Sequence, residues 1–263
     1  MKLLLVYAIC VASMVTGCAP TPSVPPSVRD DVASTGKLRV GLILSNQVLV
    51  TKDVQTGELR GVTVVLGRKL AERIGVPFEA VGYPNPAALV KSFGGNEWDI
   101  AFLAFDPARA QEVDFLPPYM LVDNSYLVPP GSNLHSVDSA DRLGVRIAVP
   151  ERSAPDLFLS RNLKAAQIVR VPGGADAAVE VLRSGRADAY AENAHMLSLY
   201  SERLPGSRVL EGRYTVIQHA IATPKGRLAA AQYVKQFIEQ SKADGTVRDA
   251  IENANLRRAS VAP

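Results

Sequence analysis

Two short segments combine a cationic side chain with the expected start of a helix. In the first, residues 104–109 (AFDPAR), Asp106 suits the N-cap and Pro107 the first helical position, which places Arg109 in the first turn. A cation there opposes the helix dipole, so an acidic partner is expected beside it. That partner is either an anionic ligand or Glu112, three residues further on.

The second segment, residues 150–156 (PERSAPD), again opens a predicted helix. Free backbone N–H groups at a helix start, together with the Ser153 hydroxyl, form a site suited to an anion. A simple N-cap is the alternative role for Ser153, and the two roles are compatible. Both segments therefore point to binding of a small anion.

Other kinds of chemistry find little support. The three histidines, His135, His195 and His219, stand alone without a second histidine or cysteine at ligand spacing, so we expect no metal and no cofactor. No nucleophile elbow or Walker-type phosphate loop occurs. The net charge is +3 and the basic residues are scattered, which argues against a nucleic-acid partner.

The elements that must position these segments follow a repeated plan. Short β-branched runs alternate with helical patterns, and the order strand, helix, strand, helix, strand occurs twice. In each copy a glycine and then an aspartate introduce the last strand. The predicted elements are 38–44, 62–74, 78–82, 87–93 and 98–103 in the first copy, and 145–149, 154–161, 168–171, 175–182 and 187–191 in the second.

Strands separated by helices imply parallel pairing, and hence an α/β fold of two lobes with open sheets. We expect lobe 1 to comprise residues 37–125 and 220–258, and lobe 2 to comprise 131–214. Residues 126–130 and 215–219 are the expected hinge strands. Ligands in such folds bind beyond the carboxyl ends of the strands, which places the site in the cleft between the lobes.

The N-terminus has the pattern of a secreted lipoprotein. Residues 1–17 read as a signal peptide that ends in a sequence resembling a lipobox, with Cys18 as the lipidated residue. A plain signal peptide with an incidental cysteine is the alternative. Residues 18–36, rich in proline and serine at their start, are expected to form the lipid anchor and an extended tether. Only Cys10 and Cys18 are present, so a disulfide framework is excluded.

Taken together, the sequence resembles the bacterial extracellular solute-binding proteins of family 3, the periplasmic amino-acid-binding components of ABC transporters, over residues 37–256. The resemblance implies a two-lobed periplasmic-binding-protein-like (type II) fold, hinge closure, an ABC permease as partner and a monomeric state. It rests on the order and spacing of the stretches LRVG at 38, LAERIGV at 70, WDI at 98, DPAR at 106, VDFLPPY at 113, SGRADA at 184 and KADGT at 242.

The resemblance also implies the ligand-binding residues. In that family the arginine at the position of Arg109 clamps the ligand carboxylate, and the turn at the position of Arg152 and Ser153 donates to the same carboxylate. Ala104, which precedes the Arg109 turn, and Asn46, which stands where a stacking aromatic residue is usual, complete this part of the expected site.

The positions expected to bind an ammonium group depart from the family pattern. The usual aspartate is Asn193 here, although Glu192, one residue earlier, could replace its charge if the strand has already ended. The usual threonine at the start of the first helix turn is Asp106, which either caps that turn or competes with an anionic ligand. Two further positions after the first strand, which are usually acidic in that family, are occupied here by Thr63 and Val65.

We therefore expect a lipid-anchored solute-binding protein that captures a small carboxylate-bearing solute, an amino acid or a derivative, for an ABC importer. Its place would be the periplasmic side of a bacterial membrane, or the cell surface. No enzymatic activity is expected. A secreted enzyme resembling cyclohexadienyl dehydratase, with Glu192 or Asp106 as the acid, is one alternative, and a ligand-sensing lipoprotein without a transporter is another.

Overall fold

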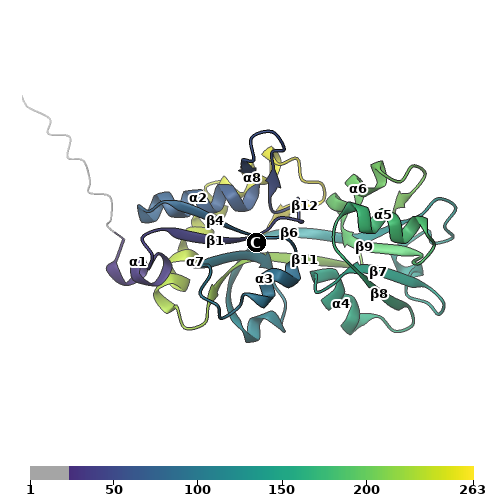
Figure 1. Ribbon diagram of the computed structural model, residues 1–263, viewed down its shortest axis with the longest axis horizontal. Helices are drawn as coiled ribbons and strands as arrows, with labels where there is room; N and C mark the ends of the chain where they lie inside the picture. The colour runs from purple at the N-terminus through teal and green to yellow at the C-terminus, as the bar shows by residue number, and fades with distance from the viewer. Residues whose placement is uncertain (1–23) are drawn as a thin grey trace, which may run out of the picture.

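Two long strands pass through both halves of the molecule (Figure 1). The computed structural model describes residues 24–263. The two strands are β6 (Val113–Val128) and β11 (Thr215–Pro224), which pair antiparallel. A lobe of helices and parallel strands lies at each end of this pair, as the repeated pattern in the sequence predicts. The predicted signal peptide, Cys18 and the first part of the predicted tether lie outside the described residues.

Lobe 1 is built on three parallel strands in the order β4-β1-β5, with β11 beside β5 in the opposite direction. Helices α2, α7 and α8 contribute to the main hydrophobic cluster, and α3 contributes to a second cluster that includes Ile43 of β1 and side chains of β5. The elements are β1 (Leu38–Ile43), β2 (Thr51–Lys52), β3 (Leu59–Arg60), α2 (Val62–Ile74), β4 (Phe78–Tyr83), α3 (Pro86–Lys91), β5 (Ile100–Ala104), η1 (Arg109–Gln111), α7 (Leu228–Ala243), α8 (Thr246–Asn253) and β12 (Ala259–Val261).

Lobe 2 repeats the arrangement, with parallel strands in the order β8-β7-β9 and β6 beside β9 in the opposite direction. Its elements are η2 (Val137–Ser139), β7 (Arg146–Pro150), α4 (Ala154–Asn162), β8 (Gln167–Val171), α5 (Ala175–Arg183), β9 (Ala189–Asn193), α6 (Ala194–Glu202) and β10 (Arg208–Val209). The sequence patterns did not predict α6, α8 or the short strands β2, β3, β10 and β12.

The same ion pair joins the central strand to the last strand in both lobes. Asp99 accepts hydrogen bonds from the backbone N–H of Arg39 at 2.8 Å and from its guanidinium at 2.7 Å. Asp188 receives the same two contacts from Arg146, each at 2.8 Å. The aspartate that introduces the last strand therefore fixes that strand to the first one, and the repeat seen in the sequence is a repeat in three dimensions.

The first connection between the lobes lies upstream of the predicted residues 126–130. Asn124 of β6 pairs with Thr215 of β11 and, on its other side, with Asn193 of β9 in lobe 2. Tyr126 and Leu127 already pair with β9. A single 16-residue strand thus carries the chain from lobe 1 into lobe 2, and the change from one sheet neighbour to the other occurs at Asn124.

The predicted tether does not reach residue 36. Helix α1 (Pro26–Val32) begins with a proline at its first position, where the missing N–H costs nothing, and buries Val28 and Val32. Its Arg29 donates to the carbonyl of Ile74 at the end of α2, and the Asp31 carboxylate accepts from the first backbone N–H groups of α7. Residues 26–32 are therefore part of lobe 1.

Helix α2 has the predicted bounds. Its stripe of Val62, Leu66, Leu70 and Ile74 is fully buried, and each large aliphatic side chain contributes roughly 1.5–3 kcal/mol when it leaves water. Gly75 ends the helix in the left-handed conformation and donates to the carbonyls of the last turn.

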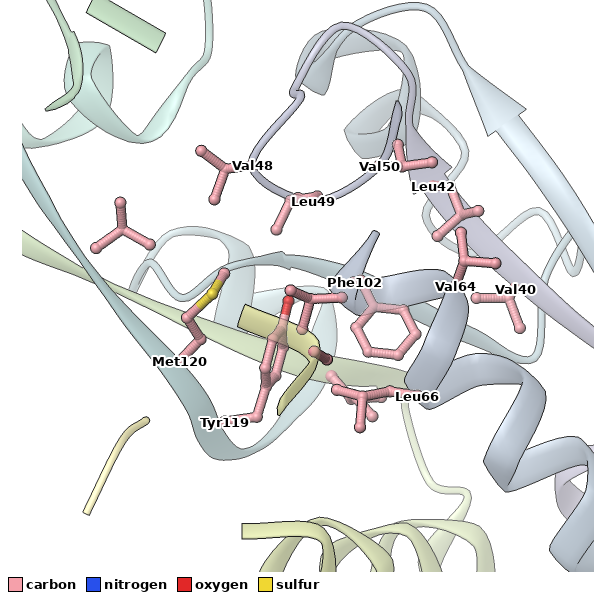
Figure 2. Packing of buried hydrophobic residues seen from close by; sticks show 14 of the residues in the cluster. Val40, Leu42, Val48, Leu49, Val50, Val64, Leu66, Phe102, Tyr119 and Met120 are labelled. Atoms are coloured by element: carbon pink, nitrogen blue, oxygen red, sulfur yellow. The ribbon is translucent and has the colours of Figure 1, made fainter. Parts of the chain in front are cut away.

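The loop of residues 46–50 follows β1 and packs its apolar side chains over the start of α2. Figure 2 shows Val48, Leu49 and Val50 in the same cluster as side chains of β1, β5 and α2. The carbonyl of Leu49 accepts from the Thr63 hydroxyl at 2.8 Å, so Thr63 holds the loop at its buried end. Gly61 lies against this carbonyl with φ of +116° and ψ of 174°, a conformation found almost only in glycine.

Gly61→Ala is therefore expected to destabilise the protein by roughly 2–4 kcal/mol, because both the backbone conformation and the contact oppose a side chain. An added Cβ would lie 2.7 Å from the Leu49 oxygen. Gly94→Ala is the matched control, since Gly94 also has a positive φ of +79° but has nothing within 4 Å of the added Cβ. Urea unfolding measures both variants, and equal losses of stability would contradict the role of the close contact.

Candidate functional site

A small cavity of about 50 Å³ lies where the two lobes meet. It is lined at the carboxyl ends of β1, β5, β7 and β9, at the starts of α4, α5 and α6, and by the middle of β6 and β11. The lining side chains with polar groups are Ser45, Asn46, Arg109, Asn124, Ser153, Glu192, Asn193, Tyr200 and His219. The position is the one that the two-lobed α/β fold predicts.

Arg109 lies in a single 3₁₀ turn rather than at the start of the predicted α-helix. The Asp106 carboxylate accepts from the backbone N–H of Ala108 at 2.8 Å, which forms a tight turn, and β6 begins only four residues after Arg109. There is no room for a longer helix. The turn directs the Arg109 side chain inward, where it is only 4% exposed.

The Arg109 guanidinium connects the two lobes. It donates to the carbonyl of Ala104 in lobe 1 and to the carbonyl of Arg152 in lobe 2, each at 2.8 Å. Its Nε has no hydrogen-bond partner within residues 24–263. No carboxylate among the described residues forms an ion pair with it, so the expected alternative partner, Glu112, does not take that role. Burial lowers the pKa of Arg109 to about 10, so the group stays cationic at neutral pH.

The turn before α4 is more occupied than the sequence suggested. Ser153 is the N-cap and its hydroxyl accepts from the N–H of Asp156 at 3.2 Å, while the N–H of Ser153 donates to Pro150. The N–H of Arg152 donates to the Asp156 carboxylate at 2.8 Å, and Pro155 has no N–H. Among the donors of this turn, only the Ala154 N–H and the Ser153 hydroxyl proton have no acceptor within residues 24–263, so these two are left for an anion.

Arg152 is consequently not the predicted donor to a ligand. Its side chain is exposed, and its φ of +56° is unusual for a residue with a side chain. Its contribution is the carbonyl that accepts from Arg109. Strained backbone of this kind is common at binding sites, and here it aims a carbonyl across the cleft.

Asp106 does not line the cavity, so of the two roles expected for it the structure shows the cap of the turn and not the contact with a ligand. One carboxylate oxygen caps the Arg109 turn, and the other accepts from Arg161 of α4 at 2.6 Å. Asp106 is buried, whereas the Arg161 side chain is about half exposed. This ion pair forms a second bridge between the lobes, outside the cavity.

Ala104 and Asn46, two of the residues expected to bind the ligand, line the cavity. Asn193 also lines it, but both ends of its side-chain amide are already used. The oxygen caps α6 by accepting from Met196 at 2.9 Å, and the nitrogen donates to the Glu192 carboxylate at 3.0 Å. Glu192 remains in the strand, yet its carboxylate is part of the lining.

The Glu192 carboxylate is poorly solvated. Burial raises its pKa to about 7, while the two hydrogen bonds from Asn193 act in the opposite direction. No cationic side chain among the described residues forms an ion pair with it. The cavity therefore holds one buried cation and one partly buried acid that are not partners of each other.

Asn124 and His219 are site residues that the sequence did not reveal. Both lie inside long strands, β6 and β11, where no local motif marks them. Asn124 Oδ1 and His219 Nδ1 are buried and have no hydrogen-bond partner in the described part of the chain. Burial, assisted by the charge of Arg109, lowers the pKa of His219 to about 3, so the ring is neutral at physiological pH. No cluster of three metal-binding side chains occurs within residues 24–263.

Comparisons with known proteins identify the family to which the chain belongs. The sequence profile of the bacterial extracellular solute-binding proteins, family 3, matches residues 38–254. The chain belongs to this family. No helix in the described part of this family member is long and apolar enough to cross a bilayer.

Similar proteins include the ABC transporter glutamine-binding protein GlnH of Bacillus subtilis, with 22% identity over 83% of this chain and 82% of the relative. A substrate-binding protein of an amino acid ABC transporter from Streptococcus pneumoniae, solved with L-arginine, has 21% identity and a TM-score of 0.73 over 85% of this chain and 96% of that one. An ancestral amino acid-binding protein, a precursor of cyclohexadienyl dehydratase, has 24% identity and a TM-score of 0.71 over 85% and 97%. The structural matches show the two-lobed fold.

The raised pKa of Glu192 predicts a pH dependence of stability for this family member. The unfolded chain releases the Glu192 proton near pH 4.5, whereas the folded protein holds it until about pH 7. Between these values the folded state binds more protons, so the free energy of unfolding falls as pH rises, by up to about 3 kcal/mol. Glu192→Gln should remove this loss.

Urea unfolding at pH 4.5 and pH 7.5 measures the effect as the difference between the variant and the parent protein. Glu211→Gln is the matched control, because Glu211 is exposed on the surface of lobe 2. An unchanged pH dependence in Glu192→Gln would contradict the burial of this carboxyl group.

Proposed function

We propose that the protein captures a small carboxylate-bearing solute, an amino acid or a derivative, and delivers it to an ABC importer. The observation that carries the proposal is the buried Arg109 guanidinium, which lines the cavity between the lobes with Nε unpaired and without a carboxylate partner among the described residues. A buried cation of this kind is stabilised by an anion that offers two oxygen atoms. A solute carboxylate is such an anion.

The mechanism follows from the two connecting strands. Rotation of the lobes about β6 and β11 would open the cleft and separate Arg109 from the carbonyl of Arg152. A carboxylate that enters beside Arg109 also meets the Ala154 N–H and the Ser153 hydroxyl of lobe 2. The solute would thus favour closure because it contacts both lobes, and the closed form would dock on the permease.

The relatives support an amino acid as the solute. GlnH of B. subtilis is named a glutamine-binding protein, and the S. pneumoniae protein was solved with L-arginine. A thermal-shift screen of amino acids, hydroxy acids, dicarboxylates and amines tests the solute class, because a ligand that binds only the folded state raises the melting temperature. A shift with amines alone, and none with carboxylates, would overturn the proposal.

A second candidate function is an enzyme related to cyclohexadienyl dehydratase. The observation in its favour is that Glu192 lies in the cavity with a pKa of about 7, which suits a general acid. Asp106 is unsuited as a general acid because its carboxylate forms an ion pair with Arg161. We expect no turnover of prephenate or arogenate by the purified protein, and turnover without added cofactor would establish the enzyme. A sensory lipoprotein is distinguished from a transport protein by a measurement of solute uptake, because a sensory protein would not support uptake.

Arg109→Ala is expected to weaken binding of the carboxylate solute found in the screen by about 2–5 kcal/mol, or roughly 30-fold to several thousand-fold. Isothermal titration calorimetry measures the loss. Arg142→Ala removes the same charge from the exposed surface of lobe 2 and should leave affinity unchanged. Equal affinity of Arg109→Ala and the parent protein would place the carboxylate elsewhere.

We also propose that Cys18 anchors the protein to the membrane through lipid. The support is the order of apolar and small residues followed by Gly17-Cys18 at the end of the predicted signal peptide. Cys18→Ser should move the protein from the membrane fraction to the soluble extracytoplasmic fraction, because the signal that provides stable attachment is lost. Cys10→Ser is the control and should stay in the membrane fraction. Release of the parent protein without detergent would contradict lipidation.

A further inference from the structure

The C-terminal segment, residues 255–263, lies outside the part of the chain that the family profile matches. It follows α8 and enters β12, which pairs antiparallel with the connecting strand β6. Figure 1 marks the C-terminus near the middle of the molecule. The segment therefore begins in lobe 1 and then runs along one of the two strands that join the lobes.

Strand β12 borders the connecting strand just before the point where β6 changes its sheet neighbour. Residues 259–261 pair with residues 120–122 of β6, shortly before Asn124. Asp123 donates its backbone N–H to the carbonyl of Arg258 at 3.0 Å. On its other side, this part of β6 pairs with β11. The connecting strand is thus held between β11 and β12 where it leaves lobe 1.

The Arg258 side chain reaches from this segment into lobe 2. Its guanidinium donates to the carbonyl of Gly212, in the loop of lobe 2 that precedes β11. Through Nε it also donates to the Asp123 carboxylate at 3.2 Å, and that carboxylate accepts from Arg213 at 2.9 Å. Arg258 therefore joins the C-terminal segment, the connecting strand and lobe 2 in one polar network.

The preceding residue forms a second contact with lobe 2. The backbone N–H of Arg257 donates to Nδ1 of His195, in the first turn of α6, at 3.3 Å. Burial, assisted by the charge of Arg257, lowers the pKa of His195 below its ordinary value, so the ring is neutral at physiological pH and can accept at Nδ1. Two successive residues of the segment therefore bind two different elements of lobe 2.

The backbone of the segment is held in unusual conformations. Asn255 and Arg258 have φ of +50° and +57°, in the left-handed region that residues with a side chain seldom adopt. Such conformations persist where the surrounding contacts fix them. At Arg258 these contacts are the bond from Asp123 to its carbonyl and the bond from its side chain to Gly212.

The contacts of the C-terminal segment lie apart from the cavity, because none of residues 255–263 lines it. They act on the lobes and not on a solute. Rotation of the lobes about β6 and β11 would move Gly212 and His195 relative to residues 257–258, and would break or strain the hydrogen bonds that join them.

We propose that residues 255–261 form a third connection between the lobes, which restrains their rotation and favours the closed arrangement when no solute is bound. The inference rests on the lobe rotation of the proposed function and on none of its solute contacts. Arg258 provides most of the restraint, because its side chain binds both Asp123 of the connecting strand and Gly212 of lobe 2.

The test measures the distance between the lobes in the full chain without solute. Spin labels on cysteines introduced by Glu72→Cys in α2 and Glu180→Cys in α5, two exposed positions, report this distance by double electron–electron resonance. The native cysteines are removed by Cys10→Ser and Cys18→Ser, so that only the introduced sites carry a label.

Arg258→Ala should shift the distances to longer values and raise the ratio of open to closed molecules about 3- to 10-fold. His195→Ala should act in the same direction by a smaller amount. His195→Asn should behave like the parent protein, because its amide oxygen can replace Nδ1 as the acceptor. Arg213→Ala is the matched control. It removes an arginine that binds the same Asp123 carboxylate from outside the C-terminal segment, and it should leave the distances unchanged.

Thermal unfolding establishes that each variant is folded before distances are compared. If neither Arg258→Ala nor His195→Ala differs from the parent protein, the third connection is wrong. An equal shift in Arg213→Ala and Arg258→Ala would also overturn it, because the effect would then belong to the charge of Asp123 alone. Since no solute is present, either result leaves the carboxylate site at Arg109 to be judged by calorimetry.

Discussion

The structure depends on one buried cation that has no acid of its own. Arg109 is removed from water at the point where the lobes meet, and it is held by one carbonyl from each lobe, those of Ala104 and Arg152. Neutral carbonyls compensate only part of the loss of solvation, and Nε has no partner among the residues that the structure describes. Under the proposed function, an anion would complete this site, and its contacts with both lobes would make binding and closure a single event.

The repeated lobes explain why so many chain segments reach the same small volume. The ion pairs Arg39–Asp99 and Arg146–Asp188 fix the first and last strands in equivalent positions, so both sheets present their carboxyl ends to the cleft. The two connecting strands then cross between these edges. Loop residues supply Arg109 and Ser153 to the cavity lining, while the connecting strands supply Asn124 and His219.

The sequence predicted most of the framework and about half of the site. The stripe on α2, its end at Gly75 and the repeated strand order are local patterns, and the structure confirms them. The side chains of Arg109 and Ser153 line the cavity. Their place could be predicted because turns at strand ends have a recognisable composition. The prediction of a tether at residues 26–32 was wrong because a proline-rich pattern does not reveal that a short helix can dock on α7.

The remaining site residues have no local signal. Asn124 and His219 occur within strands whose other residues are mostly apolar, and only the tertiary arrangement shows that they face the cavity. Whether Glu192 or Asn193 has side-chain atoms free for a solute depends on where each side chain points at the end of the strand. Residue type and spacing do not determine this direction, since Asn193 is drawn into capping α6.

The bridge between Asp106 and Arg161 has a consequence of a different kind. It joins the lobes outside the cavity, and neither residue lines the cavity. Under the proposed closure, this pair would favour the shut form to the same extent for every solute. A change in this exterior pair would therefore alter the affinity for all solutes by one common factor, while the cavity residues would set their relative affinities.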